Sequence, residues 1–491
     1  MDTAVVVVGA GPAGLMLAGE LRLAGIDVVV VEKLAEPTGE SRGLGFTVRT
    51  MEVLDQRGLL PRFGDLPTTG QHHFGGLALD LSVLDGAHLA NKTVLQSQTE
   101  AALEAWATEL GAELRRGHEL VSVTQDDDGV DIEVSGPRGG YRMRCAYLVG
   151  CDGGRSKVRK SAGFEFPGTA ATMEMLLADV RGVQLQRPDE RRYGETVPGG
   201  LVMGGDLGGG ITRIIICERG RAPKTHRSGP PAYEELVAAW KRLTGEDISA
   251  GVPVWTSAYG DASRQVSNYR KGRVLVAGDA ARIHLPAGGQ GMNASIQDSV
   301  NLGWKLAAVV RGSAPDALLD TYHSERHPVG ERLLTNTQAQ GLLFLGGSEV
   351  QPLRDVFAEL IEYENVSRHL ARMVSGLDIR YDVGAGDHPL LGRRMPHVDL
   401  ADQDRKTSTT ELLRPARGVL LDCADDAALR TAAAAWADRV DVVTAAPVDG
   451  GADNPLRGAD AFLLRPDGYV AWTSGGETGV AAALERWFGP A

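Results

Sequence analysis

The chain has 491 residues, and 51 Lys and Arg against 64 Asp and Glu give a formal net charge of −13 at pH 7. This length predicts about three domains, and the 43% hydrophobic and 23% charged residues are typical of a folded globular protein rather than a disordered one. The negative charge opposes binding to phosphate backbones and anionic lipids, so we expect neither nucleic acid nor a membrane as a partner.

The cysteines and the first residues indicate the compartment. Cys145, Cys151, Cys217 and Cys423 are far apart and form no C-x-x-C pair, which argues against a zinc knuckle or a dithiol redox centre. Residues 1–8 have no basic start followed by a long apolar stretch, as a signal peptide would, and no segment reaches the roughly 20 apolar residues that span a bilayer. We therefore expect a protein of the reducing cytoplasm.

The N-terminal residues predict a βαβ unit. Residues 4–8 (AVVVV) are a continuous β-branched run, which is typical of a strand buried on both faces of a parallel sheet. A glycine-rich turn then opens a helix that runs to about Ala24 and ends at Gly25. Residues 26–31 predict a second buried strand, which closes at Glu32.

Further elements follow in chain order, and their pattern changes after residue 170. The first stretch predicts a helix at about 98–110, hairpin strands at 119–123 and 130–134, and a strand at 147–150. Strand patterns then dominate around 173–181, 201–204 and 211–217, with one helix at 232–243, which predicts a β-rich domain. A buried strand at 274–277 precedes long helices at about 292–310, 315–335 and 352–375.

From about residue 398 the pattern becomes that of a small, separate α/β unit. It predicts strands at 418–421, 440–444, 460–464 and 469–472, and helices at 426–437 and 479–488. The resulting layout has a first domain in two parts, 1–170 and 268–390, a β-rich domain at 171–267, and a C-terminal domain at 391–491.

The first motif with a chemical meaning is G-x-G-x-x-G at Gly9, Gly11 and Gly14. Gly9 permits the tight turn, Gly11 lets the backbone approach a pyrophosphate, and Gly14 lets the helix pack closely on the sheet. Glu32 follows about twenty residues later, at the end of the second strand, where it can accept hydrogen bonds from a ribose. The unit predicts an adenine dinucleotide without choosing between FAD and NAD.

Two later motifs favour FAD. Residues 151–159 (CDGGRSKVR) follow a strand; by themselves they fit a nucleotide-contacting loop and a turn with a solvated basic cluster equally well. In the third motif a strand ends at Asp279, which can bind sugar hydroxyls, and a glycine loop at 286–291 opens a long helix. The helix N-terminus carries about half a positive charge, which suits a ring that becomes anionic, as reduced flavin does at its N1–C2 carbonyl edge.

The three motifs resemble those of the FAD-dependent aromatic hydroxylases of the para-hydroxybenzoate hydroxylase type (class A flavoprotein monooxygenases), and within that group the anthracycline and angucycline polyketide hydroxylases. The resemblance covers about residues 3–390 through GAGPAG with Glu32, CDGGRSKVR and GDAAR…PAGGQGMN…D..NL.WKL, and it continues in Y-x-x-E-R-x-P at 322–328. It implies an α/β protein: a Rossmann-like FAD-binding domain of the GR2 type, a β-rich substrate domain, and a thioredoxin-like C-terminal α/β domain that is structural because it lacks C-x-x-C.

The resemblance also implies roles for individual residues. Asp152 and Gly153 would serve both FAD and the visiting nicotinamide nucleotide. No metal is expected and no catalytic side chain is identified; the backbone at Pro286 and Gly291 is the candidate for a direct part in the flavin chemistry. The residues expected to contact FAD are Gly9, Gly11, Gly14, Glu32, Arg42, Gln98, Asp152, Gly153, Asp279, Pro286, Gly289, Gly291, Met292 and Asn293.

The reaction implied is a monooxygenation with non-covalently bound FAD. NADPH or NADH docks transiently and reduces FAD, O₂ then gives a C4a-hydroperoxyflavin, and the distal oxygen passes to a ring of a polycyclic aromatic polyketide. A homodimer is a family-level expectation. A Baeyer–Villiger oxygenase on the same scaffold remains an alternative, as does an O₂-independent flavin reductase or redox-sensing flavoprotein.

Several residues have more than one interpretation. Arg282 stands where many relatives have histidine after Gly-Asp-Ala-Ala, so the role of that position is open. His323 and His327 have metal-ligand spacing but no clear third ligand, which favours a structural role. Residues 72–73 (HH) fit a substrate cavity and a surface loop equally well. Core packing is the default for the methionines of the β-rich domain, and an apolar pocket for a flat polycycle is the alternative; they are Met173, Met175 and Met203.

Overall fold

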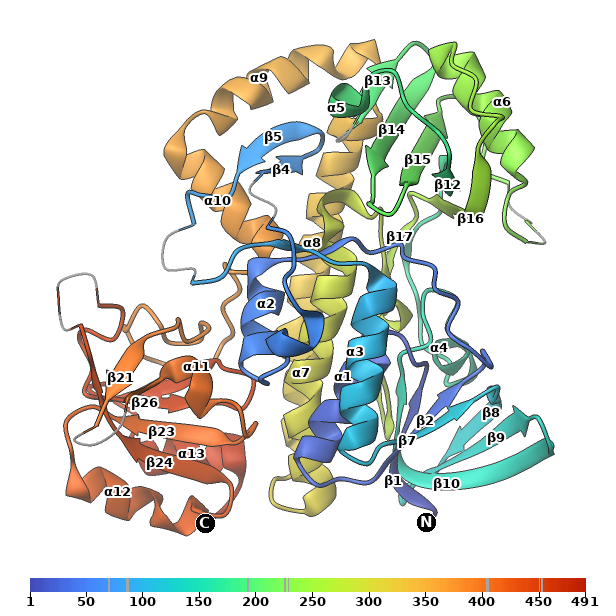
Figure 1. The fold of residues 1–491 in the computed structure, drawn as a ribbon. Coiled ribbons are helices and arrows are strands. Elements are labelled where there is room, and N and C mark those ends of the chain that lie inside the picture. Colours follow the sequence, from blue (N-terminus) through green and yellow to red (C-terminus); the bar gives the residue numbers. More distant parts are fainter. Residues whose placement is uncertain are drawn as a thin grey trace.

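The structure is a computed structural model that describes residues 1–68, 71–84, 88–191, 194–224, 227, 229–402, 406–449, 451 and 454–491. A mainly parallel sheet forms the centre of its N-terminal half, in the order β18-β19-β10-β1-β2-β7, with the hairpin β8–β9 attached to β10 (Figure 1). These strands are β1 (Thr3–Val8), β2 (Val28–Glu32), β7 (Glu113–Arg116), β8 (Glu119–Gln125), β9 (Val130–Gly136), β10 (Gly139–Gly150), β18 (Arg270–Lys271) and β19 (Val274–Val276).

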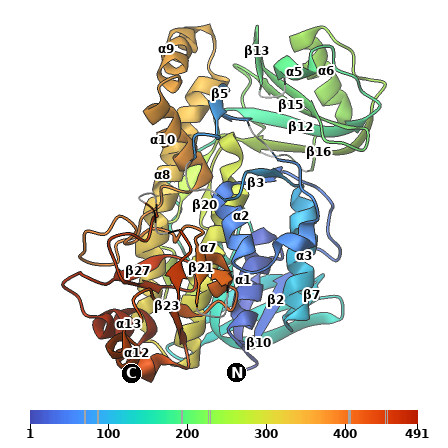
Figure 2. The same ribbon diagram turned by 60° about the vertical axis from the view of Figure 1, so that its left-hand side comes forward.

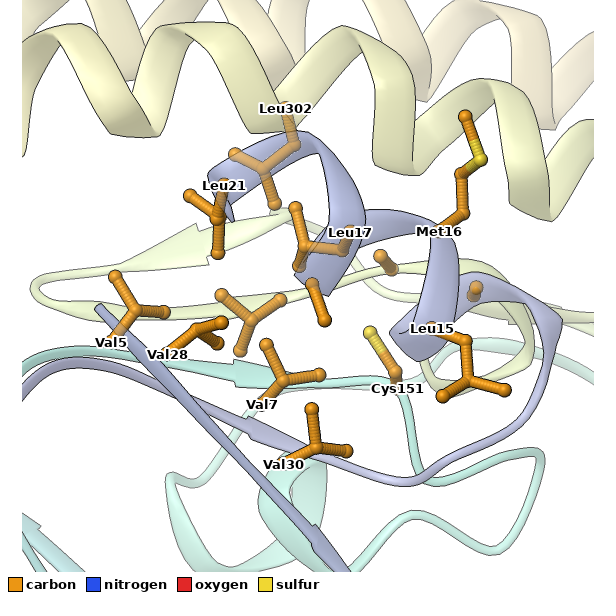
Figure 3. Packing of buried hydrophobic residues seen from close by; sticks show 14 of the residues in the cluster. Val5, Val7, Leu15, Met16, Leu17, Leu21, Val28, Val30, Cys151 and Leu302 are labelled. Atoms are coloured by element: carbon orange, nitrogen blue, oxygen red, sulfur yellow. The ribbon is translucent and has the colours of Figure 1, made fainter. Parts of the chain in front are cut away.

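The predicted βαβ unit is confirmed. Val5 pairs with Val28 of β2 on one side and with Tyr147 of β10 on the other, both in parallel register. Helix α1 (Pro12–Leu23) connects β1 to β2 and ends before Gly25. Gly25 has a φ of 72°, which is incompatible with a right-handed helix. The apolar side chains of β1, β2 and α1 pack with Cys151 and with Leu302 into one buried cluster, shown in Figure 3.

Helices α3 (Gln96–Glu109) and α7 (Gln290–Arg311) flank α1, so that the three cover one side of the sheet (Figure 1). Gly19 of α1 is required for this packing, because a Cβ there would lie 2.0 Å from the Trp106 ring of α3. Most of α7 is buried all round, which explains why its sequence has no amphipathic pattern. The smaller elements nearby are β3 (Gly45–Phe46), α2 (Val48–Asp55), η1 (Leu60–Phe63), β4 (Gln71–Phe74), β5 (Leu77–Asp80), β6 (Lys92–Thr93) and α4 (Lys157–Ser161).

A second, antiparallel sheet with the order β13-β14-β15-β12-β16 lies above the first, as Figure 2 shows. Helix α6 (Tyr233–Thr244) covers one of its faces through Leu236 and Trp240. Three short strands join it to the parallel sheet: β11 (Gly168–Thr169), β17 (Ser263–Gln265) and β20 (Arg282–Ile283). The remaining elements are β12 (Glu174–Arg181), α5 (Pro188–Arg191), β13 (Glu195–Val197), β14 (Gly200–Asp206), β15 (Ile211–Glu218) and β16 (Val252–Gly260).

The long helices after α7 differ in extent from the prediction. Helix α8 (Asp320–Leu345) starts after a 3-10 turn, η4 (Asp316–Leu319), and runs ten residues past the predicted end near 335. The predicted single helix at 352–375 is two helices, α9 (Gln351–Ile361) and α10 (Glu364–Ser375), because Tyr363 is extended with ψ of 123°. Further 3-10 turns are η2 (Gly278–Ala280), η3 (Ala287–Gly289) and η5 (Ser348–Val350).

The C-terminal part has the strand order of a thioredoxin core, β24-β23-β26-β27, in which β23 and β24 are parallel and the other pairs antiparallel. Cys423 is its one cysteine. The elements are β21 (Asp399–Ala401), β22 (Lys406–Ser408), α11 (Thr409–Leu412), β23 (Gly418–Asp422), α12 (Ala427–Ala433), η6 (Ala434–Trp436), β24 (Val440–Thr444), β25 (Ala446–Pro447), β26 (Ala461–Leu464), β27 (Val470–Thr473) and α13 (Val480–Phe488).

A buried ionic network attaches this C-terminal part to α7 and α8. The Glu325 carboxylate of α8 accepts hydrogen bonds from the two terminal nitrogens of the Arg465 guanidinium, at 2.5 and 2.8 Å. It also accepts one from the Lys305 ammonium of α7, at 2.8 Å. The Asp467 carboxylate accepts a further hydrogen bond from Arg465 and one from the Asn301 amide of α7. The guanidinium of Arg465 also lies 4.6 Å from the centre of the Trp487 ring. Within the described ranges, no helix is both long and apolar enough to cross a membrane.

Candidate active site

The glycine loop after β1 meets the loop after β10 at the carboxyl ends of the strands. A Cβ on Gly9, which has φ of 107°, would lie 2.5 Å from the Cys151 carbonyl oxygen, and one on Gly14 would lie 1.9 Å from the Gly9 oxygen. Both glycines are therefore required by the protein's own packing. This edge of a parallel sheet, at the first βα turn, is where α/β folds bind dinucleotides.

Other glycines face open space instead. A Cβ on Gly11, Gly153 or Gly289 would meet no described atom within 4 Å. The three loops that carry them are joined: Arg159 donates to the Ala280 carbonyl at 2.9 Å, and Ser299 of α7 donates to the Ala13 carbonyl at 2.7 Å. The predicted motifs thus converge on one site whose walls are backbone, and a dinucleotide with a flat ring fits such a cradle.

Two carboxylates face this site in different ways. Glu32 accepts the Ala10 amide at 2.8 Å and the Leu34 amide at 2.9 Å, one through each oxygen, which holds the carboxylate at the end of β2 beside the glycine loop. Asp279 lies in the 3-10 turn η2, shortly after β19 rather than at the strand end, and it is exposed. Its carboxylate has no hydrogen bond to any side chain or amide in the part of the chain that the structure describes.

We expect Asp279→Asn to weaken FAD binding without changing the melting temperature of the apoprotein. The exposed carboxylate stabilises nothing in the protein itself, whereas hydrogen bonds from a ligand to a charged group contribute about 1.5–3 kcal/mol each. Because Asp279→Asn removes the charge of the acceptor, we expect the affinity for FAD to fall about tenfold or more. Titration of apoprotein with FAD by flavin fluorescence measures the affinity, and an unchanged affinity would contradict the expected contact of Asp279 with the sugar hydroxyls of FAD.

Three further residues that were predicted to contact FAD have hydrogen-bond partners in the protein itself. Arg42 is exposed and donates to the Ser257 hydroxyl of β16 at 3.1 Å, so it bridges to the second sheet. Gln98 is exposed in the first turn of α3 and accepts the Leu95 amide at 3.3 Å. The Asp152 carboxylate accepts the Lys157 and Val158 amides and so caps α4. Its side chain already has partners in the protein, which sequence motifs do not reveal.

The third motif forms a turn that opens α7. Pro286 precedes η3, and both Gly288 and Gly289 have left-handed backbones, with φ of 67° and 63°. Gly291 lies against the His284 ring, and Met292 is half-buried against Gly43. Asn293 is buried: it accepts the Thr47 amide at 2.9 Å and donates to the Gly45 and Gly289 carbonyls. Asn293 therefore joins the loop after β3 to the α7 N-terminus.

Arg282, whose role the sequence left open, is a core residue. Its guanidinium, 2% exposed, donates to Asp298 of α7 at 2.6 Å and to the Tyr269 hydroxyl at 3.2 Å. Asp298 also accepts the Gly278 amide at 3.1 Å and Arg326 of α8 at 2.7 Å. The sequence motifs place Asp298 and Arg326 on helices. They do not indicate that Asp298 binds both Arg282 and Arg326 beneath the loop that carries Asp279.

The histidines are accounted for by packing contacts. His323 accepts the Tyr269 amide at 3.4 Å, and His327 lies edge-on to the Tyr269 ring. In the described ranges, no group of three or more His, Cys, Asp or Glu residues could hold a metal. His72 and His73 lie in β4, half-buried, and His73 stacks on Phe344 of α8. Burial lowers the pKa of His73 to about 4.

One face of the second sheet packs on the turn at 285–289, which precedes α7. An apolar cluster unites the sheet with Leu285 and Ala287 of that turn and with Leu345 of α8. Met175 is buried in the cluster, while Met173 and Met203 are half-buried at its edge. Met175 therefore packs in the core, as expected by default. Met173 and Met203 remain partly exposed on the sheet face that points toward the turn.

The comparisons with known proteins agree with this architecture. A family model described as "FAD binding domain" matches residues 2–337, and one described as "Aromatic-ring hydroxylase, C-terminal" matches residues 388–491. The crystal structure of CabE, an aromatic hydroxylase from angucycline biosynthesis, has 65% sequence identity and a TM-score of 0.97, and the match covers 100% of both chains.

Two curated relatives are similar over the same extent. The 12-dehydrotetracycline 5-monooxygenase/anhydrotetracycline 6-monooxygenase of Streptomyces rimosus is 45% identical, and the rifampicin monooxygenase of Streptomyces venezuelae is 44% identical, each over 99% of both chains. The predicted fold class is confirmed. Because these matches extend over nearly the whole length, the chain belongs to the family of FAD-dependent aromatic-ring hydroxylases.

Proposed function

We propose that the protein hydroxylates a polycyclic aromatic polyketide of the angucycline type, with NADPH or NADH as the electron donor and O₂ as the source of oxygen. The observation that carries this proposal is the likeness to CabE, with 65% identity over the full length of both chains. The Streptomyces rimosus relative, a monooxygenase of 12-dehydrotetracycline and anhydrotetracycline, also supports a polycyclic substrate, at a lower identity of 45%.

When bound, FAD supplies the electron transfer and the oxygen chemistry, and the protein supplies binding, orientation and exclusion of water. The backbone at Gly11 and Gly153 would hold the pyrophosphate region, Glu32 the adenosine ribose and Asp279 the ribityl chain. The α7 N-terminus, opened by Gly289, would present its partial positive charge to the flavin ring. The buried Cys151 thiol stays protonated, because burial raises its pKa.

The substrate would lie between the second sheet and the turn at 285–289. The sheet face there carries Met203 and Ile215, which pair across β14 and β15, and both are half-buried. Apolar and polarisable side chains with freedom to adjust suit a flat, rigid polycycle. The half-buried His73 and Phe344 would close the side of the same space.

We expect Met203→Trp to raise the KM for a polycyclic phenol severalfold while FAD affinity stays unchanged. The larger ring narrows the space over the turn at 285–289, whereas the pyrophosphate and ribityl contacts proposed at Gly11, Gly153 and Asp279 lie on loops outside the second sheet. Steady-state oxygen uptake at varied substrate concentration measures KM, and flavin fluorescence measures FAD affinity. If both parameters stay at wild-type values, the substrate does not lie on this face.

The test of the reaction uses purified holoenzyme with NADPH or NADH and an angucycline-type phenol. Oxygen consumption is followed with an electrode, and the product is analysed by mass spectrometry and NMR. Gain of one oxygen on an aromatic ring supports the proposal. A ring-expanded lactone would instead show Baeyer–Villiger chemistry, and oxidation of the nicotinamide nucleotide without oxygen incorporation would indicate a reductase.

A further inference from the structure

Arg282, Asp298 and Arg326 form a buried charge cluster, called here the Asp298 cluster. The side chains of Asp298 and Arg326 are 0% exposed and that of Arg282 is 2% exposed. Asp298 accepts Arg282 through one carboxylate oxygen, at 2.6 Å, and Arg326 through the other, at 2.7 Å. The cluster therefore contains two permanent cations and one anion, away from solvent.

The Asp298 cluster lies directly behind the loops that would hold FAD. The same oxygen of Asp298 that binds Arg282 accepts the amide of Gly278, the residue before Asp279. On the other side, Arg326 donates to the carbonyl of Ala294, the fifth residue of α7. The cluster thus contacts both the ribityl-side loop and the first turns of the helix whose N-terminus faces the ring.

The other buried groups around the Asp298 cluster do not cancel its excess positive charge. The adjacent ionic network contains Arg465 and Lys305 against Glu325 and Asp467, which balance each other. The Asp279 carboxylate, which would accept hydrogen bonds from the ribityl chain, is the same in every variant compared below, so it does not alter the comparison. Burial lowers the pKa of His284, which keeps the imidazole neutral. The phenols that face the cluster also stay neutral, because burial raises the pKa of each; they are Tyr269, Tyr322 and Tyr381.

We propose that the uncompensated positive charge of the Asp298 cluster, contributed by Arg282, favours the reduced, anionic form of bound FAD over the oxidised form. Arg282 is then a positioning residue that acts through the field of the cluster and through Asp298, not by touching the ring. The physical reason is that charges interact strongly at low dielectric, where neither water nor ions screen them. This inference rests on the proposed placement of FAD.

The test is a charge series measured on holoenzyme without substrate or nicotinamide nucleotide. Reduction by dithionite against a reference dye gives the ratio of affinities for reduced and oxidised FAD, relative to free FAD. Arg282→Met removes the excess charge and is expected to lower this ratio about tenfold. Asp298→Asn doubles the excess charge and is expected to raise it by a similar factor. Arg282→Lys keeps the charge, so its ratio is expected to match the wild type.

The opposite signs separate the charge effect from structural damage, which would move Arg282→Met and Asp298→Asn in the same direction. Arg465→Met serves as a matched control, because it removes an equally buried cation that packs on Trp304, farther from the N-terminus of α7, and its ratio is expected to change less than that of Arg282→Met. If one variant of the series does not fold, the other is compared with Arg282→Lys, which keeps the charge, and a ratio equal to that of Arg282→Lys would overturn the inference. No change, or equal signs, would overturn the inference while leaving FAD binding and the hydroxylation test unaffected.

Discussion

Replacement of Gly11 by aspartate is expected to abolish FAD binding while the apoprotein remains folded and at least as stable as the wild type. Gly11 is the N-cap of α1, with φ of −81° and ψ of −179°, a conformation that any residue adopts, and a Cβ there meets no described atom within 4 Å. Aspartate is also a favoured N-cap. Its charge, however, would repel the pyrophosphate, and we expect an affinity loss of at least about 100-fold.

Gly14→Ala provides the contrast within the same loop. Its Cβ would lie 1.9 Å from the Gly9 oxygen, so the apoprotein itself must distort, at a cost of about 1–3 kcal/mol. Thermal melting of both apoproteins, followed by titration with FAD, distinguishes the two effects. Wild-type FAD affinity in Gly11→Asp would show that the pyrophosphate does not approach this loop.

Glu325→Ala is expected to destabilise the folded protein by about 3–5 kcal/mol, the range for breaking a buried ion pair by removing one partner. The substitution leaves the Arg465 guanidinium and the Lys305 ammonium, both 0% exposed, without their shared carboxylate. Because Arg465 packs on Trp304 and Trp487, tryptophan fluorescence reports loosening of the C-terminal part during denaturation. A decrease in the free energy of unfolding below about 1 kcal/mol, which is typical of surface ion pairs, would show that this buried network does not stabilise the fold.

The same carboxylate gives a pH dependence with a defined sign. Burial alone would raise the pKa of Glu325, but Arg465 and Lys305 lower it from 4.5 to about 2. The group therefore contributes stability that is present above pH 4.5 and is lost as the pH falls toward 2. Glu325→Gln removes this titration, so its stability should fall less steeply than that of the wild type between pH 4.5 and 2. Parallel acid-denaturation profiles would contradict this assignment.

Features encoded in short stretches of sequence were predicted well. The β-branched runs gave β1 and β2, because a strand buried on both faces needs apolar side chains at every position. The predicted helix at 352–375 was wrong in its continuity, since the break at Tyr363 carries neither glycine nor proline. Helix α2 was missed because its eight residues are too few to show a clear helical period; its Arg49 and Glu52 pair inside the protein.

The sequence by itself indicated the family through the resemblance of its three motifs, and it predicted the glycine turns between strands and helices, because close backbone approach requires glycine at fixed spacing. Only the tertiary structure decided which of these residues contact solvent and which hold the protein together. Gly11 faces open space while Gly14 packs on backbone, and Arg282 pairs with Asp298 in the core. Glu325 and Arg465 are 140 residues apart. Such pairings arise from chain topology, and no local pattern carries them.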